Sequence, residues 1–287
     1  MKPILLLLAC AGLACAQNSN STIAPAMPYA YAANAGWLTF YPSVTYGVVV
    51  TETYLAGYAY GANIGWVRLG YVRPDNFHTY SQGNTTDFGV NVSPTGLLTG
   101  YAYSANVGWI NFEQTYGKPR IDLFTGRFTG YAYSANIGWL ALDAPGAGLA
   151  AASLHTPDND GDDISTAWEY ANFGSENVAD ELTDYDKDGV SDLREFLAGT
   201  DPKNPADFLS VISTAHTAGT TTTSLEFTSR TNRRYTIERS ADLSGTWVDS
   251  GLGLFAPSAA ATTSKSVTHP AAGRQFFRVT VRRPFSP

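Results

Sequence analysis

The chain has 287 residues, enough for two or three domains, and its 25 acidic residues exceed its 18 basic ones, giving a net charge of −7. This balance argues against nucleic acid as a partner for the chain as a whole. The charge is unevenly spread, because residues 158–201 hold fourteen acidic and two basic residues, whereas residues 208–287 hold nine basic and four acidic ones. So dense a block of carboxylates repels itself unless cations lie within it.

The N-terminal segment has the pattern of a secretory signal peptide. Lys2 precedes an apolar run, and Ala14-Cys15-Ala16 fits the small-x-small site of signal peptidase. We therefore expect a signal peptide over residues 1–16 and a secreted or cell-surface protein, of bacterial type, whose mature chain has no cysteine and no disulfide. Lipidation of Cys10 or Cys15 is the alternative. No later segment is apolar over the roughly 20 residues that a membrane-spanning helix needs, so we expect no transmembrane segment.

One aromatic motif recurs four times in residues 17–150. GYAYSANVGWINF begins at Gly100 and GYAYSANIGWLAL at Gly130, and variants begin at Pro28 and Gly57. The first tyrosine of each copy follows that of the previous copy by 29, 43 and 30 residues, so the long step carries an insertion. Similar repeats occur in bacterial envelope proteins, and this resemblance implies no particular activity.

Each copy predicts a β-hairpin. Tyr-Ala-Tyr and the Gly-Trp-aliphatic stretch alternate as strands do, and the Asn and Gly between them suit a tight turn. In the third copy this pattern places Tyr103 opposite Trp109 on one face and Ala102 opposite Ile110 on the other. Stacked units of this kind suit a solenoid, a propeller-like array or a closed sandwich, and the sequence does not choose among them.

The aromatic face of these hairpins has two interpretations. Aromatic residues that recur at a structural period usually fill a core, and the repeat therefore favours burial. If the face is open instead, its rings offer a repeated platform for the apolar C–H faces of sugar rings, with avidity from the repetition. The candidate ligand-binding residues are then Tyr60, Trp66, Tyr103, Trp109, Tyr133 and Trp139.

Two acidic loops in residues 151–206 carry the best-defined chemistry. Calcium takes about six to eight oxygen ligands, and a loop of about twelve residues supplies them from positions 1, 3, 5, 7, 9 and 12, with a backbone carbonyl at position 7 and a bidentate Glu at position 12. In DNDGDDISTAWE these positions are Asp158, Asp160, Asp162, Ile164, Thr166 and Glu169. In DYDKDGVSDLRE they are Asp184, Asp186, Asp188, Val190, Asp192 and Glu195.

The two loops differ in quality. Position 6 usually requires glycine, which the second loop has as Gly189, whereas the first has Asp163. The first loop also has Thr166 at position 9, so we expect it to bind calcium more weakly. Helix-forming residues follow each loop and end at Gly174 and Gly199. The competing interpretation, helix-capping turns without metal, leaves the clustered carboxylates unneutralised.

These residues resemble bacterial thrombospondin type 3 repeats, in which a DxDGDGxSDxxE loop and a following AGTDPxxPxD segment recur. The matching segment here is AGTDPKNPAD at residues 198–207. The resemblance implies an EF-hand-like, short α-helical spacer that calcium stiffens outside the cytoplasm. Dockerins also pair two such loops, but they usually place Asp at position 12 and have a shorter offset between loops.

Residues 207–287 predict a small β-sandwich, since runs such as RYTIERS and FFRVTVRR alternate and are separated by Gly, Ser, Asn and Pro. This segment resembles the terminal β-module that follows calcium spacers in large bacterial envelope proteins, with a capping role or a docking role as the alternatives. The sequence has no nucleophile elbow, zinc-protease motif or phosphate-binding loop, so it does not predict an enzyme.

The sequence as a whole predicts a mainly β protein with a tandem-repeat hairpin domain, a calcium module and a C-terminal sandwich. We expect a secreted or cell-surface structural or adhesive protein in which calcium rigidifies the junction between two β-domains. Carbohydrate binding by the aromatic rows is the alternative. The expected partners are calcium and extracellular carbohydrate or other envelope components.

Overall fold

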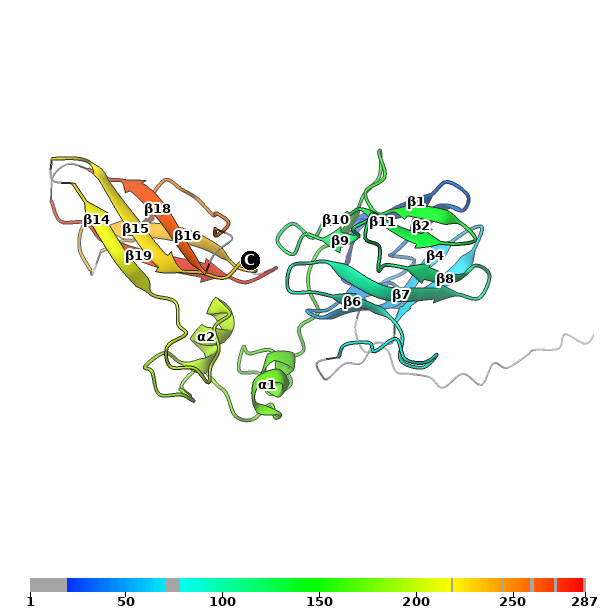
Figure 1. The fold of residues 1–287 in the computed structure, drawn as a ribbon, viewed down its shortest axis with the longest axis horizontal. Coiled ribbons are helices and arrows are strands. Elements are labelled where there is room, and N and C mark those ends of the chain that lie inside the picture. The colour runs from blue at the N-terminus through cyan, green and yellow to red at the C-terminus, as the bar shows by residue number, and fades with distance from the viewer. Residues whose placement is uncertain are drawn as a thin grey trace, which may run out of the picture.

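The computed structural model describes residues 20–70, 78–217, 219–243, 245–258, 261–270 and 273–285. The expected signal peptide, with Cys10 and Cys15, lies outside these ranges. The protein is mainly β, with two short helices between a larger N-terminal and a smaller C-terminal β-module (Figure 1). No helix within the described ranges is long and apolar enough to cross a membrane.

The N-terminal module is an antiparallel barrel of eight strands. Each strand pairs with the next, and the last strand returns to the first through Tyr31 opposite Ala141 and Ala32 opposite Leu140. Closure of the barrel leaves these eight strands without an open edge. In order they are β1 (Ile23–Ala32), β2 (Gly36–Thr39), β4 (Tyr54–Gly61), β5 (Gly65–Gly70), β7 (Leu98–Ser104), β8 (Gly108–Asn111), β11 (Tyr131–Ser134) and β12 (Gly138–Ala141).

Short strands extend this sheet at one end of the barrel. The strand β3 (Val48–Val50) pairs with β4, β6 (Val90–Val92) pairs with both β4 and β7, and β13 (Leu149–Ala151) pairs with β1. The strands β9 (Arg120–Ile121) and β10 (Phe128–Thr129) pair with each other. The closed barrel differs from the solenoid, propeller and sandwich that the repeats suggested. Four hairpins supply eight strands, which is about the number that closes around an interior filled by side chains.

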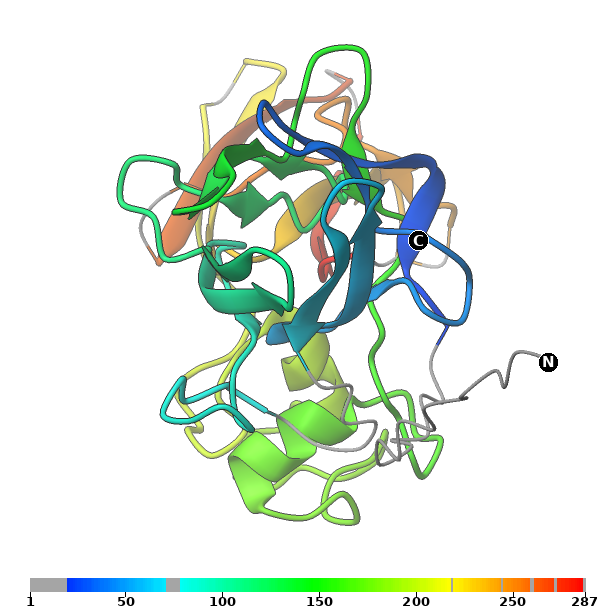
Figure 2. The ribbon, with the colours of Figure 1, turned by 90° about the vertical axis from the view of Figure 1, so that its right-hand side faces the viewer.

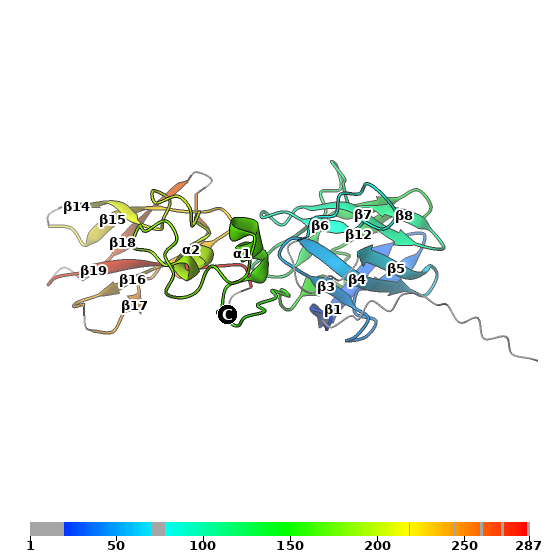
Figure 3. The same cartoon turned by 90° about the horizontal axis from the view of Figure 1, so that it is seen from below.

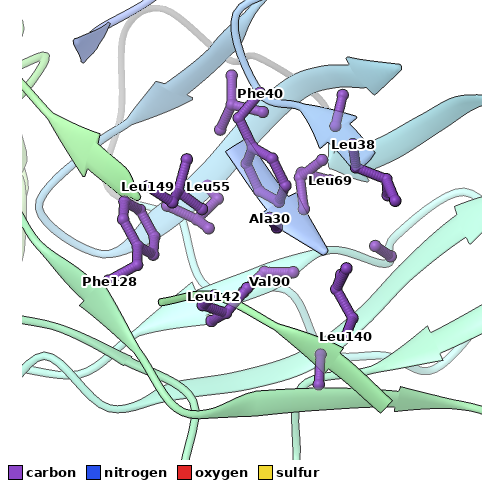
Figure 4. Packing of buried hydrophobic residues seen from close by; sticks show 14 of the residues in the cluster. Ala30, Leu38, Phe40, Leu55, Leu69, Val90, Phe128, Leu140, Leu142 and Leu149 are labelled. Carbon is purple, nitrogen blue, oxygen red and sulfur yellow. The ribbon is translucent and has the colours of Figure 1, made fainter. Parts of the chain in front are cut away.

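Each repeat forms one hairpin in the register that the alternation predicts. In the third copy Ala102 lies opposite Ile110 and Tyr103 opposite Trp109. The small and aliphatic side chains of all four hairpins point inward, where they pack with residues such as Leu38, Leu69 and Leu140 (Figure 4). An alanine opposite a larger aliphatic residue leaves enough space for that residue, so these pairs together fill the narrow interior.

The hairpin turns are tied into a ring at one end of the barrel. The asparagine of each turn donates from Nδ2 to a carbonyl oxygen in the turn of the neighbouring hairpin, and the fourth hairpin is joined to the first in the same way. The side chains of the four acceptor residues are buried. The bonds run from Asn34 to Ile137 at 3.4 Å, from Asn63 to Ala35 at 3.1 Å, from Asn106 to Ile64 at 3.1 Å and from Asn136 to Val107 at 3.0 Å.

The C-terminal module consists of two three-stranded antiparallel sheets. One contains β14 (Val211–His216), β15 (Thr222–Thr228) and β18 (Thr262–Thr268), and the other β17 (Val248–Asp249), β16 (Arg234–Ser240) and β19 (Phe276–Arg282). Both sheets contribute side chains to one buried cluster that includes Phe227, Tyr235 and Val267. The helices α1 (Thr166–Phe173) and α2 (Asp192–Ala198) lie between the β-modules along the long axis (Figure 3) and below both of them in the end-on view (Figure 2).

Candidate metal centres and aromatic belt

The structure brings the acidic residues of each predicted loop together. Carboxylate oxygens of Asp158, Asp160 and Asp162 lie within 4.8 Å of one another, and those of Asp184, Asp186 and Asp188 do the same. The first aspartate of each loop also shapes the backbone. The carboxylate of Asp158 accepts from the amides of residues 161–163, and that of Asp184 accepts from the amides of residues 187–189, at 2.7–3.3 Å in both cases.

The glutamates predicted at position 12 lie in the first turns of the helices, and their carboxylates interact electrostatically with aspartates of these clusters. Glu169 in α1 and Glu195 in α2 are both 0% exposed. Neither carboxylate oxygen of Glu169 makes a well-formed hydrogen bond in the described part of the chain, although the Ala179 amide lies near enough to lower its pKa, and Glu195 uses only Oε1, which accepts from Thr200 at 3.2 Å. A buried carboxylate without a partner is costly, so a cation, a water molecule or a proton at these oxygens would lower that cost.

The other unpartnered buried carboxylate oxygens belong to the same two sites. Their residues all occupy predicted ligand positions, and no carboxylate elsewhere in the described ranges has a buried oxygen without a partner. The oxygens are Asp162 Oδ2, Asp186 Oδ2, Asp188 Oδ2 and Asp192 Oδ2. This coincidence of burial, missing partners and loop position separates the sites from ordinary acidic turns, whose carboxylates are solvated or hydrogen-bonded.

The electrostatics of the sites disfavour bare carboxylates. Burial away from water raises the pKa of Glu169 to about 8, and the charges of Asp160 and Asp162 contribute to the rise. Burial likewise raises the pKa of Glu195 to about 7, against the opposing hydrogen bond from Thr200. A cation among these oxygens would reverse both causes, because it supplies the opposite charge and replaces the lost hydration.

The donor set fits a hard divalent cation. All side-chain donors are carboxylate or hydroxyl oxygens, and neither loop contains the nitrogen or sulfur ligands that zinc or copper prefers. Ile164 and Val190 stand at position 7, where the backbone carbonyl serves, and Thr166 offers a hydroxyl that is 0% exposed. The structure brings three of the six predicted ligand residues of each loop together, at positions 1, 3 and 5, and the residues at positions 7, 9 and 12 stay predicted ligands.

Each loop has two residues with a positive φ, at positions 4 and 6. At position 6, φ is 94° at Gly189 and 70° at Asp163, whereas at position 4 it is 81° at Gly161 and 66° at Lys187. Each loop therefore holds one residue with a Cβ in this strained conformation, and backbone strain does not rank the two loops. Asp192 at position 9 of the second loop is 0% exposed, with Oδ1 accepting from the Tyr185 amide at 3.2 Å.

The two loops and their helices share one small core. Ile164 of the first loop packs with Ala179 and with Phe196 of α2, and the rings of Trp168 and Phe196 lie 5.5 Å apart. The two loops are therefore connected through direct side-chain contacts.

The helix α2 is held by the C-terminal module. Arg233, which is only 8% exposed, donates from Nη2 to the carbonyl of Phe196 at 2.8 Å and from Nε to that of Leu197 at 2.7 Å. Arg230 donates from Nε to the carbonyl of Gly199 at 3.2 Å. Burial lowers the pKa of Arg233 to about 10, which leaves it charged at neutral pH. These bonds satisfy carbonyls that the end of a helix leaves without partners.

A second set of contacts joins the helices to the barrel. The hydroxyl of Ser165, which immediately precedes α1, donates to Glu52 Oε2 at 3.0 Å. The other carboxylate oxygen of Glu52 lies 3.8 Å from Nη1 of Arg283, whose guanidinium lies 4.6 Å from the ring centroid of Phe196. Residues of the barrel, the helices and the C-terminal module thus meet at one point.

The six aromatic residues predicted from the repeats lie on the outside of the barrel. Trp66, Trp109 and Trp139 are 43–50% exposed, and each packs edge-on against the tyrosine across its hairpin with centroids 5.0–5.1 Å apart. The interpretation that these rings fill a core is therefore wrong. The opposite face of the hairpins fills the barrel interior together with Phe40, Phe112 and Phe128. Described residues such as Tyr46 and Phe88 cover the outer rings only in part.

The first repeat contributes to the same surface. Trp37 is 46% exposed and its ring centroid lies 4.8 Å from that of Tyr31. The repeat motif identifies these two residues, although the sequence-based site omitted them. We call the exposed tyrosines and tryptophans of the four hairpins the aromatic belt; its tryptophans are Trp37, Trp66, Trp109 and Trp139.

No family model, no curated protein and no solved structure matches this chain.

Proposed function

We propose that the chain is a secreted or cell-surface structural protein in which calcium rigidifies the junction between two β-domains. The observation that carries this proposal is the set of buried, unpartnered carboxylate oxygens at the predicted ligand positions of both loops. Calcium accounts for them because it is a hard cation that accepts many oxygen ligands in flexible geometry. We take the module to be EF-hand-like and of the thrombospondin type 3 kind, and residues 207–287 to be its companion β-sandwich.

The contacts of the helices support a role at the junction. The helix α2 has only seven residues, too few to be stable alone, so its order depends on what holds its two ends. Calcium would hold Glu195 in its first turn, and Arg233 holds the carbonyl of the next residue. At the other side, Ser165 connects the start of α1 to Glu52 of the barrel. Metal binding would therefore fix both β-modules to one ordered unit.

Calorimetric titration of the mature, metal-free chain with Ca²⁺ tests this proposal. We expect saturable binding and a higher melting temperature, because a ligand held 100-fold above its Kd adds about 2.7 kcal/mol to the free energy of unfolding. Small-angle scattering should show a narrower distribution of distances between the β-modules with calcium. A melting temperature that does not respond to calcium would overturn the proposal.

Carbohydrate binding is a second candidate function, and the exposure of the aromatic belt favours it. Contiguous exposed aromatic surface of this kind commonly marks a binding site. The rings offer flat apolar faces to sugars, and four similar hairpins would add avidity. Retention of the mature chain on insoluble polysaccharides, compared with a variant in which all four belt tryptophans are alanine, tests this function independently of calcium.

A further inference from the structure

One concavity opens on the aromatic belt beside Trp109. It has a volume of about 400 Å³ and is lined by residues 82–85 with Phe88, Tyr101 and Trp109. The rings of Phe88 and Trp109 are perpendicular, with an interplanar angle of 88° and centroids 4.9 Å apart. Phe88 is buried whereas Trp109 is 43% exposed. The indole therefore offers open surface that a phenyl ring bounds on one side; we call this site the Trp109 corner.

The polar side of the Trp109 corner comes from the insertion between the second and third repeats. Gln82 donates from Nε2 to the carbonyl of Gly89 at 2.7 Å, which fixes the insertion to the barrel. The Oδ1 atom of Asn84 accepts from the amides of Thr86 and Asp87 at 2.9 and 2.8 Å, which closes the local turn. These bonds hold residues 82–85 in place before any ligand arrives.

Tight packing under the insertion adds to this preorganisation. Tyr80 is 2% exposed, and its ring lies so close to Gly70 and Gly89 that a Cβ at either glycine would come within 2.4 Å of it. The carboxylate of Asp87 accepts from the Ser81 hydroxyl at 2.6 Å. A wall fixed in this way costs little ordering entropy on binding, which distinguishes a binding site from a flexible surface loop.

The lining groups indicate the class of ligand. Among the described lining residues there is no carboxylate, ammonium or guanidinium; the guanidinium of Arg68 lies 5.5 Å from the Phe88 ring centroid and is not one of them. Asn84 and Thr85 are exposed, and the Asn84 amide nitrogen has no acceptor in the described chain. An aromatic face beside uncharged hydrogen-bonding groups suits a neutral pyranose, which has one apolar C–H face and a rim of hydroxyls.

We propose that the Trp109 corner, and not the aromatic belt as a whole, is the carbohydrate site, and that it takes one neutral pyranose unit of a polysaccharide. Trp109 stacks on the sugar ring, Phe88 limits its position, and Asn84 and Thr85 bind its hydroxyls. This inference rests on the second candidate function. Trp139 of the fourth hairpin is the matched comparison, because it is 46% exposed and packs on Tyr133 at 5.1 Å, with no phenylalanine ring beside it in the described ranges.

Fluorine NMR of the mature chain labelled with 5-fluorotryptophan tests the proposal, with cellohexaose, maltohexaose and laminarihexaose as probes. Trp109→Phe assigns the resonance of interest. We expect millimolar amounts of at least one probe to shift the Trp109 signal and to leave the Trp139 signal in place. Trp109→Ala should weaken binding roughly tenfold or more, the effect of losing about 1.4 kcal/mol of stacking. Asn84→Asp keeps the oxygen that closes the turn and removes the amide donor, so it should also weaken binding.

The outcomes separate this inference from the function on which it rests. If Trp109→Ala and Trp139→Ala weaken binding equally, the belt acts as a uniform platform, so carbohydrate binding stands and the Trp109 corner is wrong. If none of the three probes binds, both the corner and the carbohydrate function are overturned, and the calcium proposal is unaffected. Unchanged melting temperatures of the variants establish that lost binding is not lost folding.

Discussion

The carbonyl oxygen of Phe196 accepts a hydrogen bond from Arg233 at 2.8 Å, and Phe196 is the residue that follows the buried Glu195. A proposed metal ligand and an interdomain contact are therefore consecutive in one short helix. Because both residues belong to α2, a displacement of the helix moves the Glu195 side chain and the carbonyl held by Arg233 together. This adjacency gives the calcium proposal a path from the ion to the C-terminal module.

Glu195→Gln is expected to have opposite effects with and without calcium. In the metal-free chain it removes a buried carboxylate with an unpartnered oxygen, so the melting temperature should rise. With calcium it removes a charged bidentate ligand, so affinity at the second loop should fall roughly tenfold or more and the calcium-induced gain in melting temperature should shrink. Melting curves in EGTA and in calcium measure both effects. Lower melting temperatures in both conditions would indicate a purely structural glutamate.

Glu169→Gln provides the matched comparison in the first loop. This loop has a threonine at position 9, where the second loop has a carboxylate, and an aspartate in place of the usual glycine at position 6, so it should contribute less of the total calcium-binding free energy. We expect Glu169→Gln to remove the weaker step of a two-site isotherm and to leave the tighter step in place. Asp163→Gly should strengthen that weaker step, because it relieves the positive φ. A stronger first loop in the unaltered chain would contradict this order.

Calcium affinity is expected to rise with pH between about 6 and 8. Burial raises the pKa of Glu195 to about 7 and that of Glu169 to about 8, from an ordinary value of 4.5. The folded metal-free chain thus binds more protons than the unfolded chain, so these groups contribute most stability below pH 4.5 and lose it as pH rises through 7 and 8. Calcium must displace these protons. Titrations in buffers of different ionisation enthalpy should show proton release that declines at higher pH; affinity that falls as pH rises would reverse the sign.

The sequence predicted the local parts of this molecule well, because their causes are local. The alternation of Tyr-Ala-Tyr with the Gly-Trp strand sets the register of Tyr103 opposite Trp109, and the spacing of Asp184, Asp186 and Asp188 sets their convergence. Whether a metal occupies these loops stays a prediction. The periodic pattern distinguishes the two faces of a strand and does not say which face is buried, since both carry apolar side chains here.

The missed features depend on pairing between distant residues. The pairing of Tyr31 with Ala141 closes the barrel, and the local sequence around either residue does not predict this pairing. Once the barrel closes, the face of each hairpin that carries alanine and aliphatic residues fills the interior, and the face that carries tyrosine and tryptophan lies outside. The role of Arg233 could not be predicted either, because the hydrogen bond from this residue to α2 depends on how the C-terminal module packs against the helix. The insertion between the second and third repeats, which the sequence shows only as a longer step, supplies residues 82–85 to one wall of the Trp109 corner.

Arg233→Met should uncouple the C-terminal module from calcium. It removes the bonds to the carbonyls of Phe196 and Leu197 while keeping an apolar stem in a buried site. We expect hydrogen exchange of residues 211–240 to respond to calcium in the unaltered chain and to respond little in the variant, whose calcium affinity should change less. Arg278→Met is the control, since the Arg278 pair with Glu238 is exposed and should be worth at most about 1 kcal/mol. Equal responses in the two variants would exclude Arg233 as the connection.

The ring of asparagines predicts a cooperative contribution to barrel stability. Asn106→Ala removes the bond from Nδ2 to the carbonyl of Ile64, and because Asn106 does not have a positive φ, the substitution adds no backbone strain. The cost should be about 1 kcal/mol in urea unfolding of the mature chain, with Ala105→Ser at the neighbouring exposed position as the near-neutral control. Asn106 and Asn136 lie in adjacent turns, and Asn136 donates to Val107, the residue after Asn106. The loss of unfolding free energy in the double alanine variant of Asn106 and Asn136 should therefore differ from the sum of the two single losses. Additive losses would mean that each hydrogen bond acts independently and that the ring adds no cooperativity.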